Sequence, residues 1–344
     1  MSHLHRLRAN RIALLKPSAL GDIVHSLPVL HALRTKYPAA QITWVVNRSY
    51  AALLDGNTDL TDVLPFDRRG GVPAFLTLAR ELFRRRFDLV VDLQGLLRTG
   101  LMAAATLAPR RIGLAVAREG SRFAYTDVIS VAPGLHAVDR YWRVAEALGV
   151  GDVPKRFHVP ISDDAMVWAA KALAGLPRPW LTLGVGARWL TKRWPTAHFA
   201  EVATRCQRKY GGSAIFVGAD DETPLAKAVI ERIPGPALDL TGKTTLPQLA
   251  AILALADAVL ANDTGPSHLA AALGRPVVAP YTCTKVRLHG PYGQATGVES
   301  TVACQGSYLK TCPHMICMTE LTPDRVWPAL DEVLSRWANR CRSA

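Results

Sequence analysis

The sequence lacks any long apolar run. The best candidate, residues 249–260, is short and contains Asp257, whereas a membrane-spanning helix needs roughly 20 apolar residues. The basic beginning of the chain is followed by a short apolar patch, Ile12 to Leu15, and a secretory signal peptide needs a longer one. We therefore expect no transmembrane helix and no export, and hence a cytoplasmic protein.

Cysteine is also scarce. Six cysteines in 344 residues do not make the disulfide framework that is typical of small secreted domains. Cys304, Cys312, His314 and Cys317 lie near one another in the sequence but contain no C-x-x-C pair, which structural zinc sites commonly use. We therefore expect no metal site, and the role of these thiols stays open.

Acidic residues are outnumbered by basic ones, 28 to 41, and the formal net charge is +13. This balance favours an anionic partner without selecting one. The arginine clusters at 68–69, 84–86 and 110–111 have little aromatic interleaving, and no nucleic-acid-reading module is present, so we expect no nucleic-acid partner. Dispersed arginines suit an anionic membrane face or a phosphorylated glycolipid, although they could serve solubility alone.

Length and periodicity indicate two α/β domains. The chain is too long for one comfortable core, and short β-rich runs alternate with helical patterns in both halves, which predicts βαβ units and parallel sheets. We predict two doubly wound domains, residues 1–165 and 166–344, with the last helix able to pack back on the first domain. The predicted strands are 12–16, 42–47, 62–66, 88–93, 181–185, 213–217, 258–261 and 276–281. The predicted helices are 23–36, 73–86, 96–107, 137–148, 197–210, 224–232, 246–256, 268–273 and 324–337.

Ligands of doubly wound sheets bind beyond the carboxyl ends of the strands. Polar loops at predicted strand ends are therefore the candidate sites, and two such domains predict a cleft with one substrate held by each. The first loop, residues 16–23, places Asp22 at the start of a helix. Asp22 is either a helix N-cap or a carboxylate placed to accept a proton. Gly21 is the one glycine there, which excludes a dinucleotide fingerprint.

Two candidate loops follow strands in the second half. Residues 184–195 combine glycines with three cations and two tryptophans, a pattern that favours phosphate contact over a merely solvated turn. Residues 217–222 end in three acidic side chains, which could accept hydrogen bonds from ribose hydroxyls or simply complement a helix dipole.

The last candidate loop lies within residues 259–268. An apolar run stops at Asn-Asp-Thr-Gly and an Ala/Leu-rich helix follows. Free N–H groups and the positive end of the helix dipole favour an anion at such a point, although Asp263 and Thr264 could be simple caps. The polar turn suits an anionic ligand that carries hydroxyls, such as a sugar diphosphate.

Four segments in order, residues 16–22, 92–96, 186–195 and 262–268, resemble the lipopolysaccharide heptosyltransferases. Residues 92–96 and 136–140 are more similar to heptosyltransferase I than to II. The resemblance implies a GT-B fold of two Rossmann-like domains and inverting transfer of heptose from ADP-heptose, without a cofactor. It implies as acceptor the Kdo region of a lipid A precursor, and a peripheral position on the anionic cytoplasmic face of the inner membrane.

The resemblance also assigns roles by motif position. Asp22 takes the place of the general base, Lys192 meets the donor diphosphate, and Glu222 binds the ribose. The remaining donor candidates are Ala187, Arg188, Asp263, Thr264, Gly265 and His268. The acceptor candidates are Ser18, Gly21, Arg68, Arg69, Gln94 and Arg118.

Two segments depart from the family pattern. Residues 184–187 lack the usual Pro-Gly-Ala, and residues 282–286 replace a turn that usually contains glycine and proline, so the donor's sugar and base stay open. A nicotinamide dehydrogenase is disfavoured because the G-x-G-x-x-G fingerprint is missing. Another nucleotide-sugar transferase, a heptosyltransferase II-like enzyme, a sugar-nucleotide epimerase on the same fold, and a non-catalytic nucleotide-sugar or glycolipid binding protein remain alternatives.

Overall fold

Two parallel sheets of six strands each organise the computed structural model, which describes residues 3–293 and 295–342. One sheet belongs to unit 1, residues 1–160, and the other to unit 2, residues 161–344. Every strand pair in both sheets is parallel. The predicted α/β class is therefore confirmed.

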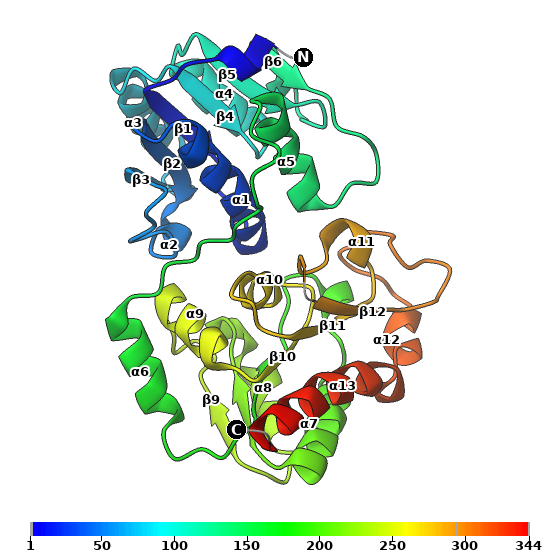
Figure 1. Cartoon of the computed structure of the whole chain (residues 1–344). Helices are drawn as coiled ribbons and strands as arrows, with labels where there is room; N and C mark the ends of the chain where they lie inside the picture. The colour runs from blue at the N-terminus through cyan, green and yellow to red at the C-terminus, as the bar shows by residue number, and fades with distance from the viewer. Residues whose placement is uncertain (1–2, 294, 343–344) are drawn as a thin grey trace. The chain divides into compact units, whose positions relative to one another are not determined.

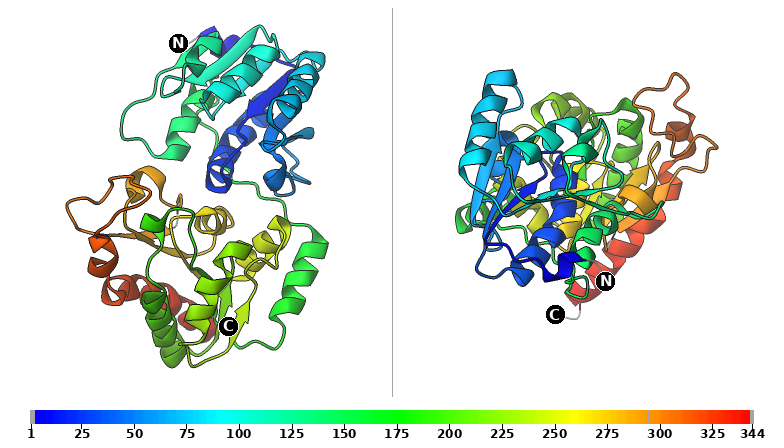
Figure 2. Two further views of the ribbon diagram at one scale, coloured as in Figure 1. Left: turned by 180° about the vertical axis from the view of Figure 1, so that it is seen from behind. Right: turned by 90° about the horizontal axis from the view of Figure 1, so that it is seen from above.

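Unit 1 has the strand order β3-β2-β1-β4-β5-β6. Its strands are β1 (Arg11–Leu15), β2 (Gln41–Asn47), β3 (Asp62–Phe66), β4 (Leu89–Asp92), β5 (Arg110–Leu114) and β6 (Asp127–Ile129). Its helices are η1 (His3–Arg6), α1 (Leu20–Lys36), α2 (Arg48–Ala51), α3 (Gly71–Arg84), α4 (Leu97–Ala105), η2 (Ser121–Ala124) and α5 (Ala137–Ala147). α1 packs with α5 and α3 packs with α4, and the two pairs cover opposite faces of the sheet (Figures 1 and 2). Because helices cover both faces of the sheet, every residue of the central strand β4 is buried.

Unit 2 repeats this topology, with the order β12-β11-β10-β7-β8-β9. Its strands are β7 (Trp180–Gly184), β8 (Ser213–Phe216), β9 (Ala237–Asp239), β10 (Ala258–Ala261), β11 (Val277–Tyr281) and β12 (Ala295–Glu299). Its helices are α6 (Asp163–Leu173), η3 (Leu190–Lys192), α7 (Thr196–Tyr210), η4 (Asp220–Glu222), α8 (Thr223–Ile230), α9 (Leu246–Leu255), α10 (Gly265–Ala272), α11 (Val286–His289), α12 (Ile316–Glu320) and α13 (Pro323–Arg342).

The last helix, α13, belongs to the core of unit 2. It lies beside α7 and contacts β10, β11 and β12 (Figure 1). Leu330 and Leu334 of α13 are fully buried in the same apolar cluster as Trp194 and Phe199. The Trp194 indole N–H also donates to the backbone oxygen of Leu321, 2.6 Å away, just before α13 begins.

Both sheets reverse their strand order at one place. In unit 1 the first strand, β1, lies between β2 and β4; in unit 2 the first strand, β7, lies between β8 and β10. The helices after the first and fourth strands of such a sheet lie on opposite faces, which opens a crevice where ligands bind. We call the strand ends of β1 and β4, and of β7 and β10, the two switch points. No helix in the described part of the chain is long and apolar enough to cross a membrane.

Candidate functional site

At the unit 1 switch point, Asp22 lies in the first turn of α1. The helix begins at Leu20, earlier than predicted, with Ala19 as its N-cap. The Asp22 Oδ2 atom accepts a hydrogen bond from the Ala19 N–H, 3.3 Å away. Asp22 is thus part of a capping arrangement but is not itself the N-cap. Its side chain remains 40% exposed, so capping and a chemical role are compatible.

Two buried side chains hold the other carboxylate oxygen of Asp22. The Tyr141 hydroxyl, from α5, donates to Asp22 Oδ1 at 2.9 Å. The Lys16 ammonium, directly after β1, lies 3.5 Å from the same oxygen. Lys16 also donates to the Tyr141 hydroxyl at 2.8 Å and to the backbone oxygen of Leu93 at 3.2 Å. A buried cation, a phenol and a half-exposed carboxylate therefore form one connected group.

Burial dominates the electrostatics of this group. It lowers the pKa of Lys16, against the opposing attraction of Asp22 and Asp92. Burial and the neighbouring charge of Asp22 together raise the pKa of Tyr141 well above its usual value. Asp92, at the end of β4, also has a raised pKa because of burial, although the hydroxyl of Tyr125 donates to it at 2.7 Å.

The loops after β4 and β5 join this switch point. The Ser18 N–H lies 3.4 Å from Gln94 Oε1, and the Arg118 N–H donates to the backbone oxygen of Gly95 at 2.8 Å. The acceptor candidates Ser18, Gln94 and Arg118 are thus brought together along one sheet edge with Gly21 in the first turn of α1.

The other two acceptor candidates lie farther along the same edge. Arg68 and Arg69 are exposed and follow β3, two strands away from β1. Their place in the acceptor site therefore stays a prediction. Arg85 and Arg111, from the other basic clusters, are engaged within unit 1: Arg85 pairs with Asp62 and Glu81, and Arg111 donates to backbone oxygens.

At the unit 2 switch point, Asp263 is the centre of a buried network. The Lys192 ammonium lies 2.5 Å from Asp263 Oδ2, and the Thr284 hydroxyl donates to the same oxygen at 2.6 Å. On the other side, His268 Nε2 and the Tyr281 hydroxyl lie 3.4 and 3.3 Å from Oδ1. Burial alone would raise the pKa of Asp263, but the His268 hydrogen bond and the Lys192 charge outweigh it and hold that pKa well below its usual range.

Lys192 is the outward member of this network. The Asp263 side chain is 4% exposed and that of Lys192 is 19% exposed. The ammonium also lies 4.9 Å from the centre of the Trp189 ring, a cation–π contact that limits its motion. Thr264 caps α10 and Gly265 begins it, and both are half-buried. A fixed cation and the amino end of a helix therefore lie on one loop pair, an arrangement that favours a phosphate.

The acidic candidate Glu222 lies against the glycine loop. Its Oε2 accepts from the Ala219 N–H at 3.0 Å. A Cβ atom on Gly186 would come within 2.0 Å of the Glu222 carboxyl carbon, and one on Gly218 within 2.4 Å of Oε2, so the two glycines leave room for the carboxylate in its present position. Burial raises the pKa of Glu222.

The other two donor candidates of the loop after β7 differ in exposure. Ala187 is buried, and its backbone oxygen accepts from Arg193 Nε at 2.6 Å, whereas Arg188 is exposed. Asn262 locks the loops after β7 and β10 to each other. Its Oδ1 accepts from the Trp194 N–H at 3.1 Å, and its Nδ2 donates to Val185 at 2.8 Å.

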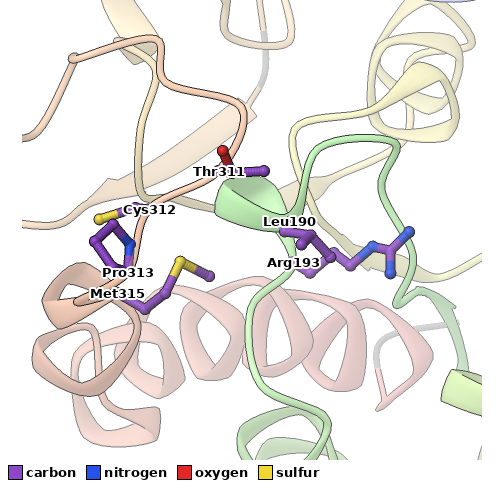
Figure 3. Close-up of a pocket in the computed structure, with 6 residues that line it drawn as sticks. All are labelled: Leu190, Arg193, Thr311, Cys312, Pro313 and Met315. Atoms are coloured by element: carbon purple, nitrogen blue, oxygen red, sulfur yellow. The ribbon is translucent and has the colours of Figure 1, made fainter.

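A pocket of about 580 Å³ borders η3 on one side. Figure 3 shows the Arg193 guanidinium directed away from Cys312, Pro313 and Met315, which form the opposite wall. Backbone N–H groups of Met315 and His314 lower the pKa of the Cys312 thiol. Within the described ranges, no three His, Cys, Asp or Glu side chains come together as a metal site.

Several contributors were missed by sequence reasoning. Lys16 begins the family-like segment 16–22, but nothing in the sequence indicates that it is buried. Tyr141 lies on α5, far away in the sequence. Thr284 lies in the segment that departs from the family turn, yet the structure gives it a direct bond to Asp263. Tyr281 is the last residue of β11 and is fully buried, so its polar end could not be distinguished from an ordinary core tyrosine.

Comparisons with known proteins show what the chain is similar to. Residues 75–316 match the model of glycosyltransferase family 9 (heptosyltransferase). The chain is 31% identical to lipopolysaccharide heptosyltransferase 1 of Pseudomonas aeruginosa, over 94% of this chain and 98% of that protein.

Two solved structures show the fold. A glycosyl transferase of family 9 from Veillonella parvula superimposes with a TM-score of 0.86 at 25% identity, over 95% of this chain and 98% of that one. E. coli heptosyltransferase WaaC with ADP superimposes with a TM-score of 0.71 at 24% identity, over 94% and 99%. The predicted GT-B fold, with its two Rossmann-like domains, is thereby confirmed.

Proposed function

Because this chain belongs to glycosyltransferase family 9, the heptosyltransferases, and is thus a glycosyltransferase, we propose that it transfers heptose from ADP-heptose to the Kdo region of a lipopolysaccharide precursor, with inversion. The similarity to lipopolysaccharide heptosyltransferase 1 over nearly the whole chain supports the first heptosyl addition. The ADP bound to the E. coli relative supports adenine in the donor.

The observation that carries the proposal is the Lys192–Asp263 pair at the start of α10. A buried carboxylate with a strongly lowered pKa fixes a cation that is still partly exposed. Departure of ADP places negative charge on a diphosphate, and fixed donors aimed at developing charge are each worth on the order of 3 kcal/mol. Lys192 and the N–H groups at Thr264 and Gly265 would supply that stabilisation.

The rest of the donor site follows from the contacts around these groups. Asp263 and His268 are buried among protein partners, so in our proposal they act through Lys192 and the shape of the loop. Glu222 accepts hydrogen bonds from the ribose hydroxyls. The backbone of Ala187 approaches the donor closely, because the glycines beside it carry no side chains. Arg188, which is exposed, closes over the phosphates.

Asp22 is the proposed general base. A free carboxylic acid has a pKa near ~3.9, far below that of an alcohol, so Asp22 cannot form an alkoxide in advance. It takes the acceptor proton while the new C–O bond forms and the bond to the diphosphate breaks. General base catalysis of this kind contributes roughly 10²–10⁴-fold to the rate.

The contacts in unit 1 say less about the acceptor than those in unit 2 say about the donor. Ser18, Gly21, Gln94 and Arg118 lie at the same sheet edge of unit 1 as Asp22, and the exposed Arg68 and Arg69 lie farther along that edge. These residues would contact the Kdo carboxylates and lipid phosphates. The net charge of +13 fits a peripheral position on the anionic cytoplasmic face of the inner membrane, which is part of the proposal.

The decisive experiment offers the purified chain ADP-heptose with two acceptors, one ending in Kdo and one that already carries a heptose. We expect the Kdo acceptor alone to gain the mass of one heptosyl residue. Transfer only to the heptose-bearing acceptor would instead show a heptosyltransferase II-like enzyme. Donor turnover with no acceptor would show an epimerase, and binding without turnover a non-catalytic protein.

Two variants separate the roles of the two units. Asp22→Asn should abolish most turnover while ADP still binds with wild-type affinity in calorimetry. Lys192→Ala should weaken ADP binding and lower the rate. Matched controls are Asp163→Asn, an exposed first-turn acid of α6, and Lys227→Ala, whose side chain is 73% exposed on α8. Wild-type ADP binding by Lys192→Ala would contradict the donor assignment.

A further inference from the structure

The sequence directly after β1 buries a lysine where apolar residues would be expected. Lys16 has 2% of its surface exposed and Tyr141 has 6%. Burying an ammonium group is costly unless it is paired and hydrogen-bonded. The Lys16 ammonium makes its bonds to Leu93 and Tyr141 and lies 4.7 Å from the centre of the Tyr141 ring. Because burying the Lys16 ammonium costs stability, we look for a functional role that this buried lysine serves.

The hydroxyl of Tyr141 has a defined direction. It accepts from Lys16 at 2.8 Å, so its own hydrogen is left to point at Asp22 Oδ1, 2.9 Å away. A chain of hydrogen bonds therefore runs from a cation through a phenol to a carboxylate. Hydrogen bonds in such a chain polarise one another, and those to charged groups are the stronger ones.

We propose that Lys16 and Tyr141 are positioning residues for the general base Asp22. The chain fixes Oδ1 and favours the ionised carboxylate, so that Oδ2, in the half-exposed first turn of α1, receives the acceptor proton. This inference rests on the proposed function and adds to it the residues that set the direction and charge of the base.

The proton balance of the transfer step is compatible with this arrangement. The acceptor O–H bond breaks and its proton passes to Asp22, while the acceptor oxygen bonds to the anomeric carbon and ADP leaves with the electron pair of the broken C–O bond. The Lys16 charge then favours release of that proton to water, which restores the carboxylate. The other charged groups that act on Lys16 are Asp92 after β4, which attracts it, and Arg140 on α5, which repels it.

The test is the pH dependence of turnover in Tyr141→Phe. Without the phenol hydrogen bond the carboxylate is easier to protonate, so we expect the acid limb of the kcat profile to move to higher pH. We expect kcat at neutral pH to fall about tenfold, the effect of losing one hydrogen bond to a charged group. The KM for ADP-heptose and ADP affinity should not change, because the donor groups lie in unit 2.

Tyr125→Phe is the matched control. It removes a tyrosine hydroxyl that donates at 2.7 Å to a different carboxylate of unit 1, the buried Asp92. We expect a similar loss of thermal stability with no movement of the acid limb. Lys16→Met is the second variant should Tyr141→Phe fail to fold, and it should move the acid limb in the same direction.

A folded Tyr141→Phe or Lys16→Met with a wild-type acid limb and wild-type kcat would overturn the inference. An equal movement of the limb in Tyr125→Phe would do so as well, because the effect would then be structural. The proposed function would survive either result provided that Asp22→Asn still abolishes turnover. Full activity of Asp22→Asn would instead remove the base itself.

Discussion

Replacing Lys192 with methionine should destabilise unit 2 more than loss of an ordinary surface lysine. The change leaves the Asp263 carboxylate, whose side chain is 4% exposed, without its cation. Breaking one side of a buried ion pair costs about 3–5 kcal/mol. Thr284, Tyr281 and His268 still contact the carboxylate, and Lys192 is itself partly exposed, so we expect about 3 kcal/mol, the lower end of that range.

The pH dependence of this loss has a definite sign. In the wild type, the lowered pKa of Asp263 contributes stability above its unfolded pKa of about 3.9, and that stability is lost as pH falls through the folded value. In Lys192→Met the lysine charge no longer opposes the effect of burial, so the pKa of Asp263 rises. An ionised Asp263 therefore destabilises the variant at neutral pH. Protonation removes that penalty, so the stability difference between the two proteins should narrow as pH falls through the raised pKa of the variant, and close only at the much lower pKa of the wild type.

Thermal unfolding between pH 4.5 and 8 checks both statements. A loss of about 3 kcal/mol in a unit of this size lowers Tm by roughly 6–12 °C. The double variant Lys192→Met/Asp263→Asn should recover part of the loss, because contacting residues couple by roughly 0.5–3 kcal/mol. Lys227→Met, on the exposed face of α8, is the control. A neutral-pH cost like that of the control, or a cost that does not vary with pH, would refute the reasoning.

Two further predictions concern the loops of the same switch point, and a third concerns the metal dependence of transfer. Gly186→Ala should displace the Glu222 carboxylate, since the new Cβ would lie within 2.0 Å of its carboxyl carbon. Calorimetry should then show ADP binding weakened about tenfold, the effect of losing a hydrogen bond to a charged group. In the control Gly175→Ala the new Cβ meets no atom within 4 Å, but φ is +79° there, so the change should cost stability and leave ADP binding unaffected. Asn262→Ala should lower the unfolding free energy by about 2–4 kcal/mol in urea titrations, because buried backbone groups lose their partners. Dialysis against EDTA should leave transfer unchanged when product is measured by mass; a lost rate restored by a divalent cation would reject a metal-free mechanism.

Strong periodicity made most of the fold predictable. Strands with continuous apolar runs, such as Ala258–Ala261, and long amphipathic helices such as Ala137–Ala147 stand close to where the pattern placed them. Four of the described strands were missed, and they are short or atypical. Asp127–Ile129 and Ala237–Asp239 have three residues each, Arg110–Leu114 opens with two arginines, and Ala295–Glu299 contains a glycine. α6 was missed because the segment before it is rich in glycine and proline, so the sequence carried no clear signal of where the helix begins.

For the candidate site, the sequence predicted which loops take part, because these loops follow the predicted strands. Parallel sheets gather the residues after each strand at one edge, which is why Asp22, Lys192 and Asp263 could be named from their loops. Sequence spacing carries no information about which side chain turns inward. That choice depends on partners from other elements, such as Tyr141 on α5 and Thr284 after β11.

The two switch points are built on the same plan but expose opposite charges. In each unit a lysine follows the first strand and an aspartate ends or follows the fourth: Lys16 and Asp92 in unit 1, Lys192 and Asp263 in unit 2. In unit 1 the lysine is sealed, with its side chain 3% exposed, and the acid that reaches solvent is Asp22 at 40%. In unit 2 the acid is sealed at 4% and the lysine reaches solvent at 19%. Group transfer needs a base for the attacking hydroxyl and a cation for the departing diphosphate. In the mechanism that we propose, the buried Lys16 of unit 1 orients the partly exposed base Asp22, and the buried Asp263 of unit 2 orients the partly exposed cation Lys192.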